Sequence, residues 1–183
     1  KESAPKYTCF VAHHKEVTME WVSKIHQLTR NLDEDPYTDT IWGILTGYDA
    51  ANALSIAKTN KPLTIERVAS GTEVALEHCV EGIWYCELNK GKIVQKKRNE
   101  SPSESQGPDD STEALAKTLN VYKAQLFVTS GHATERGWQI GFRYKNGYFK
   151  RKNGNLYGQD TSGRNIPISS NNPKVYMPIG NCL

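Results

Sequence analysis

Short apolar runs, typical of strands, alternate along this chain with segments of helical periodicity, and that order restricts its fold more than any other property of the sequence. The run at 6–12 alternates like a strand. A second strand is predicted at 38–45 and a second helix at 48–58, where Asp49 is a suitable N-cap. Between the two strands, apolar residues recur at steps of four, four, three and four, which predicts the first helix (Val17, Trp21, Ile25, Leu28, Leu32).

The middle of the chain continues in the same order. Residues 63–70 predict a third strand, and a short helix is predicted within 72–79. Two further runs, at 82–88 and 92–97, flank an Asn-Lys-Gly turn signal and therefore predict a hairpin.

A stretch rich in serine, proline and acidic residues, 99–111, predicts an exposed loop. At its end, Asp110 and Glu113 have the spacing of a capping box and open another predicted helix, at 111–120. The strand predicted at 125–130 follows, and after it come two Asn-Gly signals for tight hairpins.

The last predicted element is an apolar strand within 174–182. Alternating strands and helices favour a mostly parallel sheet covered on both faces, so we expect an α/β fold built as a three-layer α-β-α sandwich. A chain of 183 residues, 37% of them hydrophobic, can bury one substantial core. We expect an amino-terminal α/β subdomain at 1–98, the exposed loop at 99–111 and a second subdomain at 112–183. No apolar run approaches the roughly 18 to 20 residues that a membrane span needs.

The net charge is only +3, but the basic residues are concentrated in two runs, at 90–98 and 143–152. Such runs are usually solvated hairpin faces, and no nucleic-acid-binding motif accompanies them. Nucleic acid is therefore not an expected partner.

The four cysteines are too scattered for a disulfide scaffold and form no C-x-x-C pair. The nearest approach to a metal cluster is His78, Cys79 and Cys86. Because Cys86 lies in a predicted strand, a buried free thiol is its expected state, and we expect neither a metal site nor a cofactor.

Two chemically reactive residues, His132 and Cys182, follow predicted apolar strands and lie fifty positions apart. If those strands are neighbours in one parallel sheet, their ends lie about 5 Å apart and the two side chains share a crevice. A thiolate and an imidazole are the groups that acyl transfer needs, and backbone N–H groups at 131–133 and beside Cys182 could stabilise the oxyanion. The plainer interpretation, a turn histidine and an inert thiol, stays open.

The segments LFVTSGHATERGWQIG at 126–141 and VYMPIGNCL at 175–183 resemble the two signatures of the caspase-hemoglobinase group of cysteine peptidases. In that group an apolar strand precedes a histidine with small neighbours, and another precedes the nucleophilic cysteine. Within the group, DPYTDTIWGILTGYDAANALSIAK at 35–58 resembles the gingipain family. The resemblance spans most of the chain, and its strongest motifs are the His and Cys elements.

The resemblance implies a caspase-hemoglobinase-like sandwich that cleaves protein or peptide substrates, with His132 as general acid/base and Cys182 as nucleophile. The caspase histidine likewise lies about 50 residues upstream of its cysteine. Gly131, Ala133 and Glu135 would be oxyanion or site neighbours. The family usually has glycine directly after the histidine, and Ala133 would be strained there if the position needs positive φ. A secreted or cell-envelope location would fit the family.

Two rival hypotheses remain beside a gingipain-like cysteine endopeptidase. One is a peptidase-like domain without activity that serves as a binding or scaffold module, indicated by Ala133 and by the basic hairpin residues Lys150, Arg151 and Lys152. The other is a metal-binding or redox domain on His78 and its neighbouring cysteines. We also expect the chain to be a fragment of a larger protein, ending just after the nucleophile strand.

Overall fold

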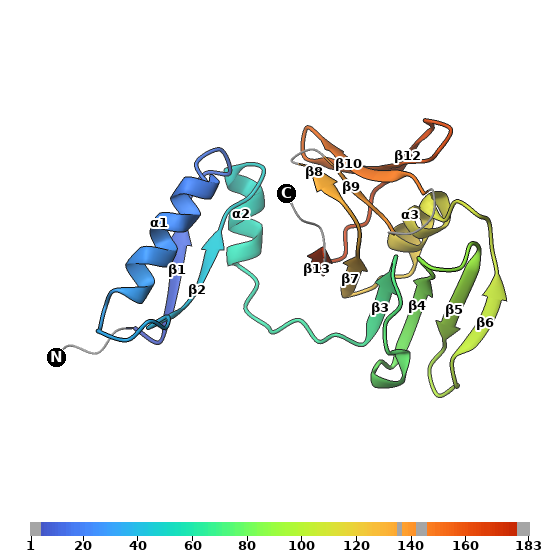
Figure 1. Ribbon diagram of the computed structural model, residues 1–183, viewed down its shortest axis with the longest axis horizontal. Helices are drawn as coiled ribbons and strands as arrows, with labels where there is room; N and C mark the ends of the chain where they lie inside the picture. The colour runs from blue at the N-terminus through green and yellow to red at the C-terminus, as the bar shows by residue number, and fades with distance from the viewer. Residues whose placement is uncertain (1–4, 135–136, 142–145, 179–183) are drawn as a thin grey trace. The chain divides into compact units, whose positions relative to one another are not determined.

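The computed structural model describes residues 5–134, 137–141 and 146–178 (Figure 1). The chain divides into two compact units, residues 1–62 and 63–183. This boundary differs from the division around 99–111 that the sequence favoured. Both units combine strands and helices, so the chain is of the α/β class. No described helix is long and apolar enough to cross a membrane.

The first unit has the order strand, helix, strand, helix: β1 (Tyr7–Val11), α1 (Met19–Arg30), β2 (Ile41–Leu45) and α2 (Ala50–Ala57). The two strands are parallel and paired in register from Tyr7↔Ile41 to Val11↔Leu45. Each helix begins at a capping side chain, because Thr18 Oγ1 accepts from the Trp21 N–H (3.2 Å) and Asp49 Oδ1 accepts from the Asn52 N–H (2.8 Å). The predicted Asp49 cap is therefore confirmed.

The core of the first unit is small and aromatic. The Phe10 ring makes edge contacts with Trp21 and Trp42, with centroids 6.3 and 6.0 Å apart. Ile25 is buried, whereas Leu28, which belongs to the same apolar periodicity, is 57% exposed. Thr29 is buried in its place, and its hydroxyl donates to the Ile25 carbonyl (2.9 Å), which removes the cost of burying a polar group there.

The second unit is built on a six-stranded mixed sheet in the order β13-β7-β3-β4-β5-β6. The neighbours from β13 to β4 are parallel, and β5 and β6 are added antiparallel. The short helix predicted within 72–79, between the third and fourth strands, is a 3-10 helix, η1 (Leu76–His78). The strands are β3 (Arg67–Ser70), β4 (Glu81–Tyr85), β5 (Lys92–Lys96), β6 (Ser103–Gln106), β7 (Leu126–Thr129) and β13 (Val175–Pro178).

Strand β6 lies in the stretch that the sequence predicted as an exposed loop at 99–111. Its four residues are exposed, as expected, but they pair with β5 in register from Lys92↔Gln106 to Gln95↔Ser103. The Lys92 ammonium lies 2.9 Å from the Glu104 carboxylate across this pair. Pairing with an existing strand therefore orders a segment whose own composition is typical of a loop.

A second sheet of five antiparallel strands follows β7 in the chain, in the order β12-β11-β10-β9-β8. Asn153 and Gly154 form the turn between β10 and β11, with φ of 51° and 76°, so the second Asn-Gly signal marks a tight hairpin as predicted. The strands are β8 (Ala133–Thr134), β9 (Gly137–Gln139), β10 (Tyr148–Lys152), β11 (Asn155–Gln159) and β12 (Asn165–Ile168).

Helix α3 (Thr112–Val121) packs between the two sheets, against β11 and β12 on one side and β3 on the other (Figure 1). Leu115 and Leu119 of this helix are buried together with Phe127 of the first sheet and Phe149 of the second. The layer on this face therefore consists of α3 and the antiparallel sheet. That differs from the layer of helices expected in an α-β-α sandwich.

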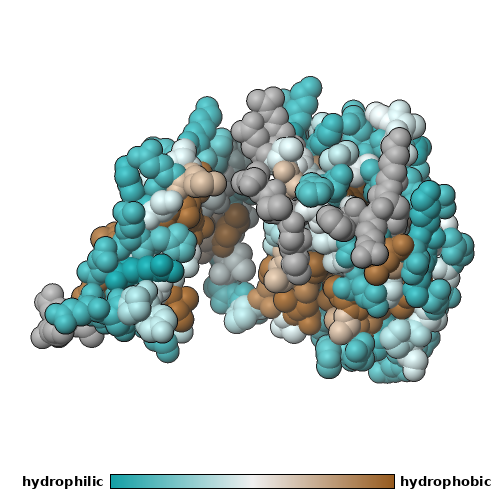
Figure 2. All heavy atoms as spheres, viewed as in Figure 1, coloured by the Kyte–Doolittle hydropathy of each residue, from teal (hydrophilic) through white to brown (hydrophobic). Residues whose placement is uncertain are grey.

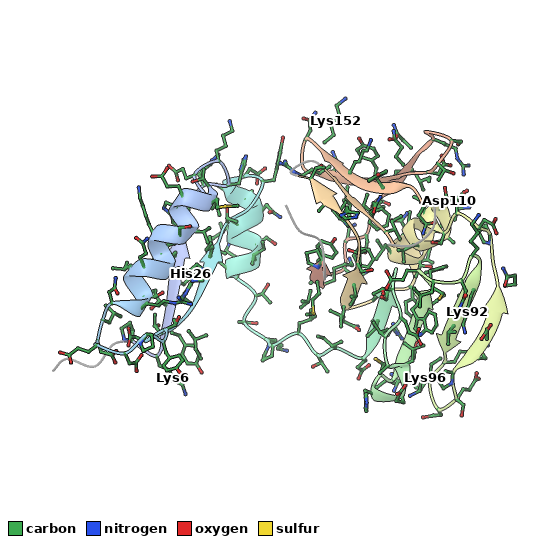
Figure 3. The ribbon with its side chains drawn as sticks, in the orientation of Figure 1. Lys6, His26, Lys92, Lys96, Asp110 and Lys152 are labelled. Carbon is green, nitrogen blue, oxygen red and sulfur yellow. The ribbon has the colours of Figure 1, made fainter. Side chains whose placement is uncertain are left out.

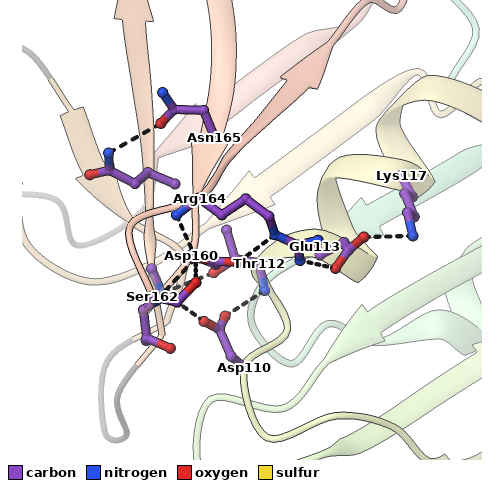
Figure 4. A network of polar contacts seen from close by, with 11 residues as sticks. Asp110, Thr112, Glu113, Lys117, Asp160, Ser162, Arg164 and Asn165 are labelled. Carbon is purple, nitrogen blue, oxygen red and sulfur yellow. Dashed lines mark hydrogen bonds and ion pairs between the residues drawn. The ribbon is translucent and has the colours of Figure 1, made fainter.

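A polar network fixes the start of α3 (Figure 4). The Asp110 carboxylate accepts from the Thr112 N–H (2.9 Å) and from the Thr161 N–H (2.8 Å). Glu113 does not reach back as a capping box requires, because it is bound by Arg164 and by Lys117. Ser111 is the N-cap residue, and its side chain makes no capping bond. Asp110, one residue earlier, accepts from the first helical N–H, so the predicted capping box is not formed and Glu113 holds the β11–β12 connection instead.

The opposite face of the six-stranded sheet carries apolar side chains that are buried on β3 and β7, as at Val68 and Val128, and partly open to solvent on the edge strand β13. Figure 2 shows them gathered over β13, β7 and β3. Along β13, Tyr176 packs against the core cluster, whereas Val175 and Met177 alternate to the other face and are 42% and 45% exposed.

Candidate functional site

The two strands that precede the predicted dyad are neighbours. β7 and β13 are parallel and in register from Val175↔Leu126 to Pro178↔Thr129. The carboxyl ends of parallel strands meet at one edge of a sheet, which is where open α/β sheets place their ligands. The sequence analysis made a shared crevice depend on these two strands being neighbours in one parallel sheet, and they are. His132 lies beyond this edge of β7, whereas Cys182 and Glu135 lie outside the described residues.

Gly131 makes the turn that presents His132. Its φ is +119°, a region that L side chains rarely adopt, and it is buried. A Cβ at this position would lie 3.0 Å from Gln139 Cβ and 3.2 Å from the Gly141 carbonyl oxygen. The turn therefore requires glycine for its conformation and also for the space around it.

Gln139 holds the backbone of His132 from both sides. Its N–H donates to the His132 carbonyl (2.8 Å), and its Oε1 accepts from the His132 N–H (3.3 Å). His132 itself is exposed, so a residue with a fixed backbone stands at the open edge of the sheet. Because the His132 N–H already has an acceptor, it is not the free oxyanion donor that the sequence suggested.

Ala133 lies in strand β8, opposite Trp138. The positive-φ residues other than glycine in the described chain are Asn99, Lys123 and Asn153, so Ala133 has an ordinary backbone conformation. The strain expected for alanine after the histidine does not arise, because the positive φ of this turn belongs to Gly131.

A carboxylate that was not predicted from the sequence joins three strand ends at the same edge. Glu87 follows β4, and it accepts hydrogen bonds from the hydroxyls of Ser130, after β7, and Thr72, after β3. The Ser70 hydroxyl in turn donates to the Thr72 carbonyl (2.6 Å). Only part of this signal was present in the sequence, since Ser70 and Ser130 end predicted strands, whereas Thr72 lies two residues after one and Glu87 lies within the run predicted at 82–88.

The edge strand β13 is fastened to β7 by a pair of hydroxyls. Thr129 Oγ1 lies 2.7 Å from the Tyr176 hydroxyl, and Thr129 is fully buried. Burial raises the pKa of Tyr176 to about 12, although the hydrogen bond with Thr129 acts in the opposite direction. This contact fixes β13 against the strand that carries His132.

The described cysteines do not resemble a metal or redox centre. Cys9 is exposed, Cys79 is half-buried, and neither these nor Cys86 forms a disulfide. Cys86 is buried as predicted, and its sulfur accepts from the N–H groups of Leu88 (3.4 Å) and Asn89 (3.3 Å). Within 5–134, 137–141 and 146–178, no three His, Cys, Asp or Glu side chains are grouped closely enough to hold a metal ion.

Comparisons with protein families, with curated proteins and with solved structures found no match to this chain. The function of the chain must therefore be inferred from the two sequence motifs and from the geometry of the strand ends.

Proposed function

We propose that this protein is a gingipain-like cysteine endopeptidase in which His132 and Cys182 form the catalytic dyad. The parallel pairing of β7 with β13 is the observation that carries the proposal. In that register Thr129 is the partner of Pro178. His132 comes three residues after Thr129, and Cys182 comes four residues after Pro178. Counted from this pair of partners, the two residues are therefore almost equally far along the chain.

The chemistry of the dyad follows from the two side chains. The Cys182 thiolate attacks the substrate carbonyl, and the His132 imidazolium donates its proton to the leaving amine, which leaves an acyl-enzyme thioester. Water then attacks the thioester, with the neutral imidazole as general base. Backbone N–H groups beside Cys182 are the preferred oxyanion donors, since the His132 N–H is bound to Gln139.

Glu87 has a positioning role in this proposal. It holds Ser130, two residues before His132, through a hydrogen bond to a charged acceptor, which is stronger than one between neutral groups. We also infer that the second unit is a variant of the caspase-hemoglobinase sandwich, in which α3 and the antiparallel sheet cover one face of the central sheet.

The test is covalent labelling by thiol-directed peptidyl ketones. A panel with Arg, Lys, Asp or Ala before the reactive group allows for an unknown specificity. We expect the wild-type protein to be labelled by at least one member and the Cys182→Ala variant by none. Cys9→Ala is the matched control, because Cys9 is an exposed thiol. Equal labelling of wild type and Cys182→Ala would refute the nucleophile assignment.

The rival function, a peptidase-like binding module without activity, is favoured by one observation. Lys150, Arg151 and Lys152 lie on strand β10, and Lys152 points away from the body of the unit (Figure 3). A folded protein that no panel member labels and that hydrolyses no denatured protein substrate would support this module. Cleavage that is lost in both His132→Ala and Cys182→Ala would exclude it.

A further inference from the structure

The antiparallel sheet has one face in the core and one face outside. Phe149 of β10 is fully buried, so its neighbours Tyr148 and Lys150 point outward, as strand alternation requires. Lys150 is paired with Gly137 on β9 and with Tyr157 on β11. On the outer face a hollow of about 510 Å³ is lined by Thr134, Gly137, Tyr148, Lys150, Arg151 and Tyr157.

Gly137 keeps this hollow open. It is paired with Thr134 on one side and with Lys150 on the other, so it lies in the middle of the row of outward residues. A Cβ there would lie 2.9 Å from the Phe149 carbonyl oxygen and 3.1 Å from Lys150 Cγ. A side chain at this position would displace Lys150, whereas glycine leaves the base of the hollow empty.

Lys150 supplies a positive charge to the hollow. Its Nζ donates to Gln159 Oε1 (2.5 Å) and lies 6.0 Å from the centroid of the Tyr148 ring. Both contacts are with neutral groups, and no carboxylate of the described residues forms an ion pair with Lys150. A carboxylate is the natural complement of this ammonium group, and the rings of Tyr148 and Tyr157 can pack on the stem of a glutamate or aspartate.

The hollow is connected to the candidate catalytic histidine by hydrogen bonds. Gln139, which accepts from the His132 N–H, donates through Nε2 to the Tyr148 hydroxyl (3.2 Å). Two strand spacings of about 4.8 Å, together with two residues along β10 at about 3.4 Å each, place Lys150 about 12 Å from His132. An extended peptide covers that distance in about three or four residues.

We propose that this hollow, the Lys150 subsite, binds an acidic side chain of a protein substrate three or four residues from the bond that is cut. The subsite rests on the proposed function of His132 and Cys182, and it identifies acidic polypeptides as the substrate class.

The first experiment measures binding without catalysis. The Cys182→Ala protein is titrated with two fluorescein-labelled decapeptides of Gly, Ser and Ala that carry three Glu or three Gln residues, and anisotropy is recorded. We expect the Glu peptide to bind about fivefold more tightly or better, which corresponds to about 1 kcal/mol for one half-exposed ion pair. Lys150→Glu should abolish that difference. Lys97→Glu is the control, because it makes the same change at an exposed lysine directly after β5 of the six-stranded sheet. This variant should keep the preference for the Glu peptide.

The second experiment uses the active protein on a mixture of peptides, with the cut positions read by mass spectrometry. We expect Glu and Asp to be enriched three or four residues from the cut, and Lys150→Gln to remove that enrichment among the cuts that are detected. Cutting without any acidic preference, together with equal binding of the Glu and Gln peptides, would overturn the subsite and leave the peptidase proposal standing. Lys150-dependent binding of the Glu peptide without any cutting would overturn the peptidase proposal instead.

Discussion

Replacing Gly131 by alanine tests the geometry on which the candidate site depends. At φ of +119° the residue lies outside the left-handed well that other residues occasionally occupy. Holding an L residue there costs about 1 to 3 kcal/mol. The new Cβ would also meet Gln139 Cβ at 3.0 Å and the Gly141 carbonyl oxygen at 3.2 Å, and such crowding adds about 1 kcal/mol. We therefore expect Gly131→Ala to lower the free energy of unfolding of the second unit by about 2 to 4 kcal/mol.

Three other glycines separate the causes of that loss. Gly163 has φ of +85° but no atom within 4 Å of the place that a Cβ would take, so Gly163→Ala should show the backbone cost alone, about 1 to 2 kcal/mol. Gly43 lies in β2, has no positive φ and also has nothing within 4 Å, so Gly43→Ala should be neutral or slightly stabilising. Gly147 gives the complementary case, because its Cβ would collide with the Gln159 carbonyl oxygen without positive φ.

The assay is urea unfolding at constant temperature, followed by tryptophan fluorescence. Trp84 and Trp138 report on the second unit, and Trp21 and Trp42 on the first. If Gly131→Ala unfolds in the second unit at the same urea concentration as wild type, the positive-φ turn before His132 is refuted. If the variant is destabilised as expected, its rate of ketone labelling in the native range should also fall, because the turn no longer presents His132 in one position.

Three further predictions concern side chains near the site and the start of α3. Glu87→Gln should weaken two charge-assisted hydrogen bonds, lowering the free energy of unfolding by about 1 to 3 kcal/mol and slowing cleavage, as measured by denaturation and peptide hydrolysis. Hydrogen bonding, first from the Ser162 hydroxyl, lowers the pKa of Asp160 from 3.8 to about 2. This stabilisation is complete above the unfolded value and is lost as pH falls toward 2, so Asp160→Asn should flatten the stability profile between pH 4 and 2, and an unchanged profile would contradict it. Tyr176→Phe should cost about 1 to 2 kcal/mol in urea unfolding, because it leaves the buried Thr129 hydroxyl without its partner.

Elements with a strong local pattern could be predicted from the sequence. The strand that becomes β7 and the helices that become α2 and α3 have apolar periodicity and recognisable caps or turns nearby. The Asn153-Gly154 hairpin was predictable for the same reason, since both residues adopt the positive φ that such a turn needs. Strand β6 was not, because Ser103–Gln106 has no apolar alternation and becomes a strand only by pairing with β5.

The candidate site shows the same division between local and distant information. The sequence placed His132 at a strand end correctly, and Gly131 next to it marked the turn. Nothing in the sequence indicated that Gln139 would hold the histidine, because that contact depends on how β8 folds back on β9. The objection to Ala133 also came from sequence position alone. It disappears once the positive φ is located one residue before the histidine instead of one residue after it.

The missed role of Glu87 has a more general reason. Only two strand ends, those before His132 and Cys182, were paired from the sequence, although parallel strands deliver their carboxyl ends to one edge together. Thr72, Glu87 and Ser130 follow three strands that lie side by side in the order β7, β3, β4, yet Ser130 and Glu87 are 43 positions apart in the chain. Only the strand order makes them neighbours, and periodicity carries no information about strand order. Glu87 lies inside the run 82–88, which the turn signal after it assigned to a hairpin, so there was no reason in the sequence to place its carboxylate beside the ends of the parallel strands.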